Sequence, residues 1–487
     1  MHSPAPYDSG ISALSWICLS DTHFGAENSL LSLVKRDDAS IDPDNPSPVL
    51  SALIACLRDL VDLDPNAPRP TLILNGDILE LALAEDNVAA MVFDRFVDLA
   101  FDPNYPLFNP TILYLPGNHD HHLWETARER MYADYVATTP VGDELVAPYH
   151  ATRLFVNRGG HDLEAELVNA LVRRRWPREH LHVKVVYPNL GLESTYSGRQ
   201  VLIHHGHFTE SIYRLMSFAK ATLFPKQPLG DEVWDWEADN FAWIDFFWST
   251  LGRSGSAGQD VGLIYDMLQN KGAMRRLAGE LGEFAGDRGP RPTRVITKWL
   301  GREAAGDLVD VVSGRERQHP EVVLTAAGRQ GLMEYLGGPL ARQYIREGNG
   351  QTGEKVSFVF GHTHKPFECT LEVPGFSGPL SIYNSGGWVV DTPDTQANQG
   401  AAVLLIDADC NVTSLRMYNQ ASSPAGYMVS LSSVADTTTN DLRERLAAGL
   451  QFDQSPWRDF SETVAAEVTL RHELLPKIIQ RGLKYTD

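Results

Sequence analysis

The sequence predicts an α/β fold, and two observations support this prediction. Five short apolar runs each end in a cluster of polar residues, and helical patterns separate the first three runs. Apolar runs of this length are typical of strands buried on both faces, and strands that alternate with helices indicate a sheet with right-handed crossovers. Because ligands bind at the carboxyl ends of strands in such sheets, we expect the polar clusters to form one site.

The first three expected strands are separated by two expected helices. The strands are Ser15–Leu19, Thr71–Leu74 and Thr111–Leu115, and the helices are Val49–Leu63 and Asn87–Leu99. Each strand leads directly into polar residues that can bind a metal. This order indicates repeated βα units.

The second half of the chain has a different pattern. Two further strands, Gln200–Ile203 and Val356–Phe360, flank the mostly helical segment 208–350, which must therefore leave the sheet and return. Later β-like segments alternate with turn residues as in an antiparallel meander, and they are Glu368–Val373, Leu380–Tyr383, Ala401–Ile406 and Val412–Tyr418. Residues from Ser430 onward look helical, with the clearest amphipathic pattern at Phe460–Arg481.

Composition limits the classes of function. The chain has 487 residues, of which 43% are hydrophobic and 9% aromatic, as in a globular protein with a sizeable core. Its formal net charge of -21 speaks against a broad nucleic-acid-binding face, because phosphate backbones need a basic surface. A small phosphate substrate is compatible with this charge, since bound metals would supply local positive charge.

Cysteine usage and hydropathy give an expected compartment. The four cysteines, Cys18, Cys56, Cys369 and Cys410, lack C-x-x-C spacing and indicate a reducing environment. The first twenty residues carry no Lys or Arg, so we expect no signal peptide. No run approaches the roughly 18 apolar residues that span a bilayer, so we expect no transmembrane segment and a cytoplasmic protein.

The polar clusters combine carboxylates, imidazoles and one amide, without a thiolate. They are Asp21, His23, Asp77, Asn118, His204 or His205, His362 and His364. This mixture suits Mn²⁺, Fe or Zn²⁺ and is too rich in nitrogen for a Ca²⁺ or Mg²⁺ site. Asp21 and His23, like His362 and His364, are two positions apart, so in extended backbone both side chains of a pair would point the same way. A hydrolytic site with two metals needs such a set, with open positions for water and substrate.

Five motifs in order resemble those of the calcineurin-like metallophosphoesterase superfamily. The series D-x-H, G-D-x-x-[DE], G-N-H-[DE], H-G-H and G-H-x-H stands here as Asp21-Thr22-His23, Gly76-Asp77-Ile78-Leu79-Glu80, Gly117-Asn118-His119-Asp120, His205-Gly206-His207 and Gly361-His362-Thr363-His364. One such motif would be weak evidence, but five in order, each after a strand-like run, are specific.

The resemblance implies a fold and a division of the chain. The fold is a four-layer αββα sandwich with a large helical insert and a C-terminal helical tail. We expect residues 12–207 and 351–420 to form the discontinuous core, 208–350 a helical insert or cap, and 421–487 a C-terminal helical extension.

The resemblance also implies how the metals are held. One metal would be bound by Asp21, His23, Asp77 and His364, and the second by Asp77, Asn118, His205 and His362. Asp77 would bridge the two ions. His205 is preferred to His204 because it directly precedes Gly206, as the ligand of the family does. The cofactors would be two divalent ions, with manganese expected first and iron, zinc, cobalt or nickel as alternatives.

The implied reaction is hydrolysis of a phosphate monoester, a phosphate diester or a pyrophosphate bond. Metals about 3.5–4 Å apart would share a bridging hydroxide that attacks phosphorus in line. With Asp77 as the shared carboxylate, His119 would stabilise or protonate the leaving oxygen. Glu80 is expected to orient His119, and His207 is a further candidate for a place behind the ligands. His121, His122 and His207 are each equally compatible with a surface position and with a contact to the substrate or to a metal ligand.

Four related functions can be compared on the same motifs. Protein serine/threonine phosphatases carry Asp-Arg-Gly after the second motif, whereas Glu80-Leu81-Ala82 stands here, and the net charge disfavours a DNA nuclease. The UDP-2,3-diacylglucosamine hydrolases, which act on a lipid-linked nucleotide, share G-D-x-x-E and a helical insert, but their third motif usually reads G-N-R-D where this chain has His119. A non-catalytic scaffold would have lost motif residues, and none is missing. We therefore expect a general phosphoesterase whose small substrate could include a nucleotide or lipid-linked ester.

Aromatic residues are concentrated in the expected insert. They are Trp234, Trp236, Phe241, Trp243, Phe246, Phe247 and Trp248. The favoured interpretation is the core of a helical cap or a dimer interface. The alternative is an acyl or nucleobase pocket in a lid over the metals. If the aromatic residues form a dimer interface, we expect a homodimer through the insert or the C-terminal helix.

Overall fold

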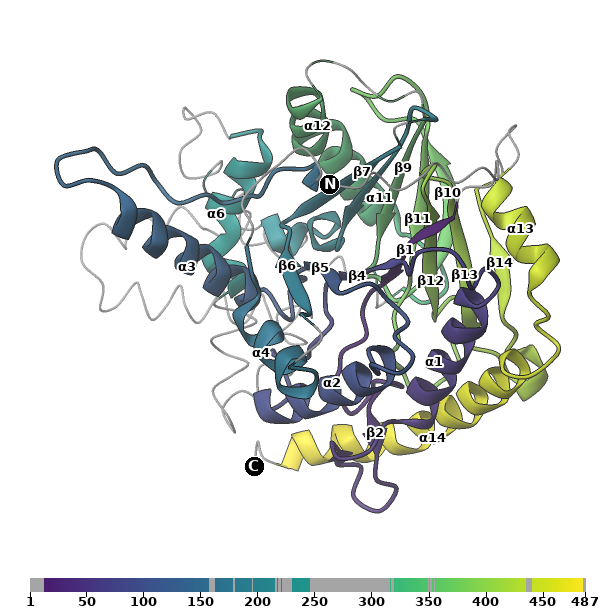
Figure 1. The fold of residues 1–487 in the computed structure, drawn as a ribbon. Helices are drawn as coiled ribbons and strands as arrows, with labels where there is room; N and C mark the ends of the chain where they lie inside the picture. The colour runs from purple at the N-terminus through teal and green to yellow at the C-terminus, as the bar shows by residue number, and fades with distance from the viewer. Residues whose placement is uncertain are drawn as a thin grey trace, which may run out of the picture.

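A computed structural model describes most of the chain. The described residues are 13–156, 163–177, 180–194, 196–214, 217, 220, 230–245, 316, 319–348, 350, 353, 355–434 and 440–484. Within them the strands form two large sheets, which lie face to face with helices on both outer sides (Figure 1). A small hairpin of β2 (Leu33–Val34) and β3 (Ile41–Asp42) stands apart from both sheets.

The first sheet has seven strands in the order β14-β13-β12-β1-β4-β5-β6. Its strands are β1 (Leu14–Leu19), β4 (Thr71–Asn75), β5 (Thr111–Leu115), β6 (His182–Val185), β12 (Gly400–Asp407), β13 (Val412–Asn419) and β14 (Ser430–Ser432). The run β1-β4-β5-β6 is parallel, and β12 joins it antiparallel to β1. The predicted βα units therefore supply β1, β4 and β5 of this run, and β6 extends it as a strand that was not predicted from the sequence.

The second sheet has five strands in the order β10-β11-β9-β8-β7. Its strands are β7 (Asn189–Glu193), β8 (Arg199–His204), β9 (Lys355–Phe360), β10 (Phe367–Leu371) and β11 (Leu380–Asn384). The central strands β8, β9 and β11 are mutually parallel. The fourth and fifth polar clusters of the sequence follow β8 and β9, so they approach the site from this sheet.

Helices cover the outer faces of both sheets. They are α1 (Pro48–Val61), α2 (Asp86–Ala100), α3 (His122–Thr138), α4 (Glu166–Arg175), α6 (Val233–Asp245), α11 (Ala326–Tyr335), α12 (Ala341–Glu347), α13 (Asp441–Gly449) and α14 (Trp457–Lys484). Short helical turns are η2 (His207–Thr209), η3 (Ser211–Arg214), η7 (Leu336–Leu340), and η8 (Pro424–Gly426). Local signals begin α1, where the Ser47 side chain accepts a hydrogen bond from Leu50 N–H and Pro48 occupies the first turn.

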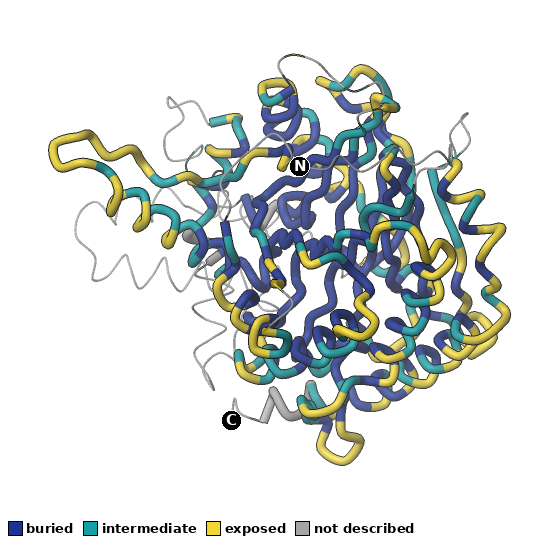
Figure 2. Tube along the Cα trace, in the orientation of Figure 1, coloured by how far each residue is buried: buried dark blue, intermediate teal, exposed yellow. Residues whose placement is uncertain are grey.

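Three hydrophobic clusters define four layers. One joins α1, α2 and α14 to the outer face of the first sheet. The second lies between the sheets and includes Cys18 and Ile73 from the first sheet and Ile203 and Val359 from the second. The third joins the outer face of the second sheet to α11 and η7. The predicted αββα sandwich with a helical tail is confirmed. Figure 2 shows that most of the buried segments of the chain lie in the interior of this sandwich.

Two local predictions of the sequence are wrong. The late strands do not form a single antiparallel meander, because β11 pairs parallel with β9 while β12 and β13 cross to the first sheet. The C-terminal region begins with strand β14, which pairs with β13 before the helices start. The first error arises because pairing between strands that are not neighbours in the chain leaves no local pattern in the sequence, and the second because β14 has only three residues.

The last part of the 208–350 segment packs as a layer of the sandwich. Leu332, Leu336 and Leu340 are fully buried against apolar side chains of the second sheet, such as Leu202 and Phe358. Helices are required on this face because the parallel strands beneath it are apolar on both sides. The domain boundaries drawn from the sequence stay a prediction, with α11 to α12 forming the fourth layer.

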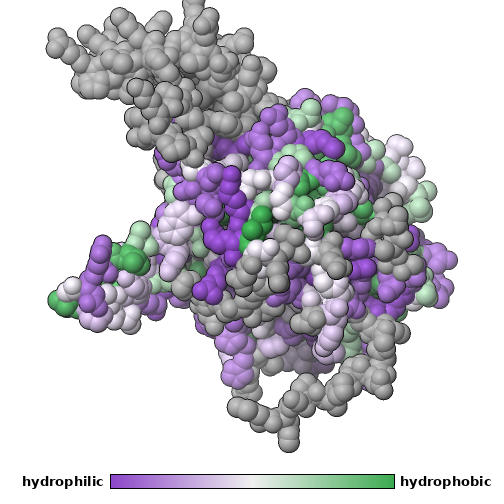
Figure 3. Space-filling view, turned by 90° about the horizontal axis from the view of Figure 1, so that it is seen from above, coloured by the Kyte–Doolittle hydropathy of each residue, from purple (hydrophilic) through white to green (hydrophobic). Residues whose placement is uncertain are grey.

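Helix α3 projects from the body of the molecule (Figure 1). Its buried residues, Leu123, Trp124 and Ala127, all lie near its start. The loop that follows exposes large apolar residues such as Val141 and Val146. Figure 3 shows hydrophobic and hydrophilic residues mixed on this projection.

None of the described helices combines the length and the apolar composition that crossing a membrane requires.

Candidate metal centre

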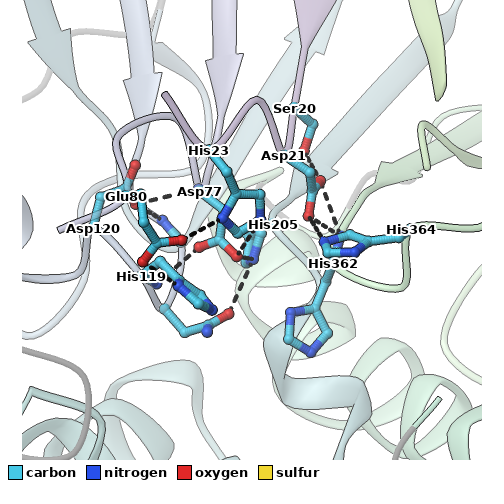
Figure 4. Close-up of polar contacts among 12 residues, drawn as sticks. Ser20, Asp21, His23, Asp77, Glu80, His119, Asp120, His205, His362 and His364 are labelled. Atoms are coloured by element: carbon cyan, nitrogen blue, oxygen red, sulfur yellow. Dashed lines mark hydrogen bonds and ion pairs between the residues drawn. The ribbon is translucent and has the colours of Figure 1, made fainter. Parts of the chain in front are cut away.

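The five polar clusters of the sequence meet where strands of both sheets end. Asp21 and His23 follow β1, Asp77 follows β4, and Asn118 and His119 follow β5. From the second sheet, His205 follows β8, and His362 and His364 follow β9. Figure 4 shows these side chains converging from several loops. All of them are buried.

The loops at this centre use an uncommon backbone conformation. Positive φ angles occur at Asp21 (51°), His23 (45°), Asp77 (52°), His362 (70°) and His364 (57°). Left-handed backbone costs a non-glycine residue of order 1–3 kcal/mol and tends to mark functional sites. The backbone is therefore not extended at either i, i+2 pair. Asp21 and His23 reach one group of ligand atoms, whereas His362 and His364 reach two different groups.

One group of ligand atoms comprises Asp21, His23 and His364, whose donor atoms lie within 4.8 Å of one another. Nε2 of His364 lies 3.5 Å from Oδ1 of Asp21. The Asp21 carboxylate also accepts hydrogen bonds from the Ser20 hydroxyl and from the backbone N–H of His362, the latter at 2.9 Å. These contacts fix the carboxylate and leave it facing the imidazoles.

A second group comprises Asp77, His205 and His362 within the same 4.8 Å limit. Nε2 of His205 lies 3.3 Å from Oδ2 of Asp77 and 3.2 Å from the side-chain oxygen of Asn118. The same Asp77 oxygen lies 3.7 Å from Nε2 of His23, which belongs to the first group. One carboxylate oxygen is thus shared between the two groups.

The sequence left His204 and His205 as neighbouring candidates, and the structure separates them. His205 joins the Asp77 group. His204 instead accepts a hydrogen bond at Nδ1 from Gly206 N–H, and its ring lies 4.7 Å from the ring of Tyr335 in the outer helical layer.

Electrostatics keep the two aspartates ionised. Burial alone would raise their pKa values, but the surrounding imidazoles outweigh it, so the pKa of Asp21 is lowered and that of Asp77 is well below its ordinary value. For His205, burial would lower the pKa, but the charge of Asp77 raises it to about 9. The centre therefore concentrates negative oxygen and imidazole nitrogen in a buried space.

Atoms at the centre suit a pair of divalent cations. Among the described residues, Asp77 Oδ2 and His364 Nε2 are buried without a hydrogen-bond partner. Buried polar atoms are costly without partners, and both atoms point into the ligand groups. Carboxylate, imidazole and amide donors are the ligands that Mn²⁺, Fe and Zn²⁺ accept. The donor set therefore fits two metal ions with Asp77 between them.

Glu80 links a candidate ligand to the candidate acid. Its two carboxylate oxygens each lie 2.8 Å from an imidazole Nδ1, one on His23 and the other on His119. The rings of His23 and His119 meet edge to face at 4.8 Å. This is the position expected of a residue that orients His119, and Glu80 holds His23 as well.

Three acidic residues at the centre received no role from the sequence. Asp391 lies 2.7 Å from His364 Nδ1, and Glu210 lies 3.4 Å from His362 Nε2. Asp120 accepts hydrogen bonds from the backbone N–H of Gly117 and of Ile78, which ties two site loops together. Asp120 stands within a motif and could have been found there, whereas Asp391 and Glu210 lie outside the motifs.

The remaining histidines lie beside the centre. His207 is fully buried, with its ring 5.8 Å from that of His205 and 4.4 Å from Phe208. Burial, followed by the neighbouring histidines, holds the pKa of His207 well below its ordinary value. His121 is buried against Tyr187, whereas His122 is partly exposed. The structure brings none of these rings into the Asp21 group or the Asp77 group of candidate metal ligands.

Helix α6 carries part of the aromatic concentration. Trp236 packs against Phe208 and Tyr335, as expected for the core of a cap. The ring centroid of Phe241 lies 5.1 Å from that of His121. Trp234 is 36% exposed. Phe246, Phe247 and Trp248, and the side chain of Trp243, lie outside the described residues. A pocket over the metals stays a prediction.

Comparison with known proteins gives one match. The family model described as calcineurin-like phosphoesterase matches residues 16–262, which is just over half of the chain. A search of curated proteins finds no match.

Proposed function

The chain belongs to the calcineurin-like phosphoesterase family, and on this basis we propose that it is a hydrolase that uses two divalent metal ions to cleave a phosphate ester or pyrophosphate bond. The shared Asp77 oxygen carries the proposal, since it lies 3.3 Å from His205 in one ligand group and 3.7 Å from His23 in the other. A carboxylate between two such groups is what a paired metal site requires.

Each group has its own set of ligands in this proposal. Asp21, His23 and His364 hold the first ion, and Asn118, His205 and His362 hold the second, with Asp77 common to both. Bound ions would lower the pKa of a water molecule and polarise the phosphoryl group. We expect manganese, with iron, zinc, cobalt or nickel as alternatives, because the donors are carboxylate, imidazole and amide.

His119 serves as the proton donor to the leaving oxygen. Glu80 accepts a hydrogen bond from Nδ1 of His119, which fixes the ring and assigns the transferred proton to Nε2. The backbone N–H of His119 donates to Oδ1 of Asp77 at 2.8 Å, and the His119 ring meets the ring of the candidate ligand His23 at 4.8 Å. Loss of such a proton donor costs about 10²–10⁴-fold in rate.

The substrate is proposed to be a small phosphate monoester, diester or pyrophosphate. The net charge of -21 disfavours long nucleic acids. Retention of the whole ligand set favours catalysis over a scaffold role, and the ordered geometry around Asp77 supports the same choice. A lipid-linked nucleotide is the alternative, and it would have to contact the segment that contains α6.

Activity of the metal-reconstituted protein tests this proposal. Protein stripped of metal and reloaded with Mn²⁺ should hydrolyse bis-p-nitrophenyl phosphate or p-nitrophenyl phosphate, and the ratio of the two rates reports the preference for diesters or monoesters. Asp102→Ala changes a carboxylate at an exposed surface turn away from the centre, so it serves as a control variant and should keep full activity. Absence of turnover with each of Mn²⁺, Fe²⁺, Zn²⁺, Co²⁺ and Ni²⁺ across a panel of phosphoesters would overturn the enzymatic proposal.

A further inference from the structure

Three imidazoles at the metal centre turn Nδ1 towards a protein acceptor. The pairs are His23 with the Glu80 carboxylate at 2.8 Å, His364 with the Asp391 carboxylate at 2.7 Å, and His205 with the backbone carbonyl of Asn75 at 3.2 Å. In each of these rings Nε2 is the nitrogen that faces a carboxylate of the centre. An acceptor behind a metal-binding histidine fixes the tautomer and raises the basicity of the opposite nitrogen.

His362 has the opposite arrangement. Its Nε2 lies 3.4 Å from Oε1 of Glu210. Nδ1 is therefore the nitrogen of His362 that remains to bind a metal. The ring of Tyr213 meets the His362 ring edge to face at 5.4 Å. Glu210 therefore contacts the ring nitrogen of His362 that is not expected to bind a metal, just as Asp391 does for His364.

The fold holds Glu210 in this position. Gly206, with φ of 125°, turns the chain after β8 into η2, where Glu210 N–H donates to the carbonyl of His207 at 3.0 Å. Helix α11 lies against this turn at Gly331, where an added Cβ would be 2.0 Å from the Thr209 carbonyl oxygen. The segment carrying Glu210 is therefore wedged between the metal centre and the outer helical layer.

Burial makes the Glu210 contact energetically significant. Glu210 is 3% exposed, and a carboxylate out of water must be compensated by charges and donors. Burial lowers the pKa of Lys365, and the main charge that opposes this is Glu316, 3.7 Å from the ammonium, with Glu210 a smaller contributor. The Lys365 ammonium, however, donates to the carbonyls of His319 and Val322 at 2.8 Å each. The Lys365 ammonium is therefore held by the loop that contains His319 and Val322.

We propose that Glu210 and Asp391 are positioning residues, one for each metal. Glu210 holds His362 and so acts on the second ion, whereas Asp391 holds His364 and acts on the first. This inference rests on the proposed metal pair. Removing an acceptor behind a metal-bound histidine typically lowers metal affinity about 10–100-fold, and here each loss should fall on one ion.

The test measures metal occupancy separately at the two positions. Crystals of metal-free protein are soaked in Mn²⁺ at a concentration that just saturates the wild type, and anomalous scattering gives the occupancy beside His362 and beside His364. The variants are Glu210→Gln, which removes the charge but keeps an acceptor, Glu210→Ala, which removes both, and Asp391→Asn. Glu164→Gln is the control, because Glu164 is an exposed carboxylate 3.8 Å from His182, away from the centre.

The expected pattern is reciprocal. Glu210→Gln should lose Mn²⁺ beside His362 and keep it beside His364, Glu210→Ala should lose more, and Asp391→Asn should show the reverse. Isotherms of Mn²⁺ binding in solution should show a 10–100-fold weakening of one step only. Wild-type occupancy at both positions in the Glu210 variants, or equal loss at both, would overturn the inference. A wild type that does not bind two ions would overturn the proposed function as well, so the two failures are distinguishable.

Discussion

The two sheets contribute to the metal centre in different ways. The first sheet supplies Asp21, His23, Asp77, Asn118 and His119 from three consecutive parallel strands. Their loops are joined to one another, since Asp77 accepts from His119 N–H, and Asp120 accepts from Gly117 and Ile78. This half of the centre is supported by contacts among neighbouring strand ends.

The second sheet supplies His205, His362 and His364, and these depend on more distant support. Glu210 reaches His362 from a turn pressed against α11, and Asp391 reaches His364 from beyond β11. The first half of the centre is therefore supported by its own βα loops, whereas the second half is supported by later loops, one of which, the turn that carries Glu210, packs against the outer helical layer. Substitutions in the two halves should therefore have different consequences.

The largest effect should come from Asp77, which belongs to both halves. Asp77→Asn removes the shared negative charge between the ligand groups, so we expect turnover to fall by about 10³-fold or more. Steady-state kinetics on bis-p-nitrophenyl phosphate, with metal content measured on the same sample, gives the result. Activity within tenfold of wild type would show that the two groups do not share a carboxylate.

A smaller effect, dependent on the leaving group, should come from His119 in the first half. His119→Gln should lower turnover about 10²–10⁴-fold for alkyl phosphate esters, because their leaving oxygen needs a proton. The loss should be much smaller for p-nitrophenyl esters, whose leaving group departs as a stable anion. Equal losses on both kinds of ester would assign His119 to substrate binding and not to proton donation.

A substitution at Gly331 tests whether the contact between α11 and the turn that carries Glu210 supports the second half of the centre. Alanine in a helix is ordinarily better than glycine by up to about 1 kcal/mol, but here its Cβ would be 2.0 Å from the Thr209 carbonyl oxygen. We expect Gly331→Ala to destabilise the protein by about 1–3 kcal/mol and to weaken one of the two Mn²⁺ binding steps. Urea unfolding and Mn²⁺ isotherms measure the two effects.

Gly378→Ala is the matched control for this change, since a Cβ at Gly378 meets no atom within 4 Å. Unaltered Mn²⁺ binding in Gly331→Ala would show that the helical layer does not support the metal centre.

The smallest effect concerns Glu237 on α6, in the same outer region. Burial raises the pKa of Glu237 well above its ordinary value of 4.5, and the neighbouring Tyr187 hydroxyl opposes this rise only in part. The folded state then retains a proton that the unfolded chain releases above about pH 4.5, so this group lowers the free energy of unfolding as pH rises. Glu237→Gln should be more stable than wild type by about 1–3 kcal/mol at pH 8.

The advantage of Glu237→Gln should shrink at pH 5, where the wild-type carboxyl keeps its proton in more of the unfolded molecules. Urea unfolding of metal-free protein at the two pH values measures this difference. An advantage that does not change between pH 5 and pH 8 would mean that the carboxyl is not protonated in the folded state.

The strength of the local pattern decides how far the sequence could predict the molecule. The strands β1, β4 and β5 and the helices between them have strong local patterns, so their positions were predicted to within a few residues. Helix α3 was missed because it buries residues only near its start and therefore has no apolar stripe. The parallel pairing of β11 with β9 was missed because it depends on contacts between distant segments.

Prediction of the site had the same limit. The candidate ligands stand in motifs, and the structure brings them together in buried groups. Glu210 and Asp391 could not be found, because an acidic residue in a loop has no pattern that reveals which imidazole it contacts. The left-handed backbone at Asp21 and His364 was also missed, since aspartate and histidine do not by themselves signal a positive φ.

Asp77 is proposed to join two metal ions in one centre, and electron paramagnetic resonance of the Mn²⁺-loaded protein can detect this pairing. Ions about 3.5–4 Å apart should give the signal of a spin-coupled manganese pair at two equivalents of Mn²⁺ per chain, and Asp77→Asn should abolish it. A six-line signal from isolated Mn²⁺ at every stoichiometry would contradict the account.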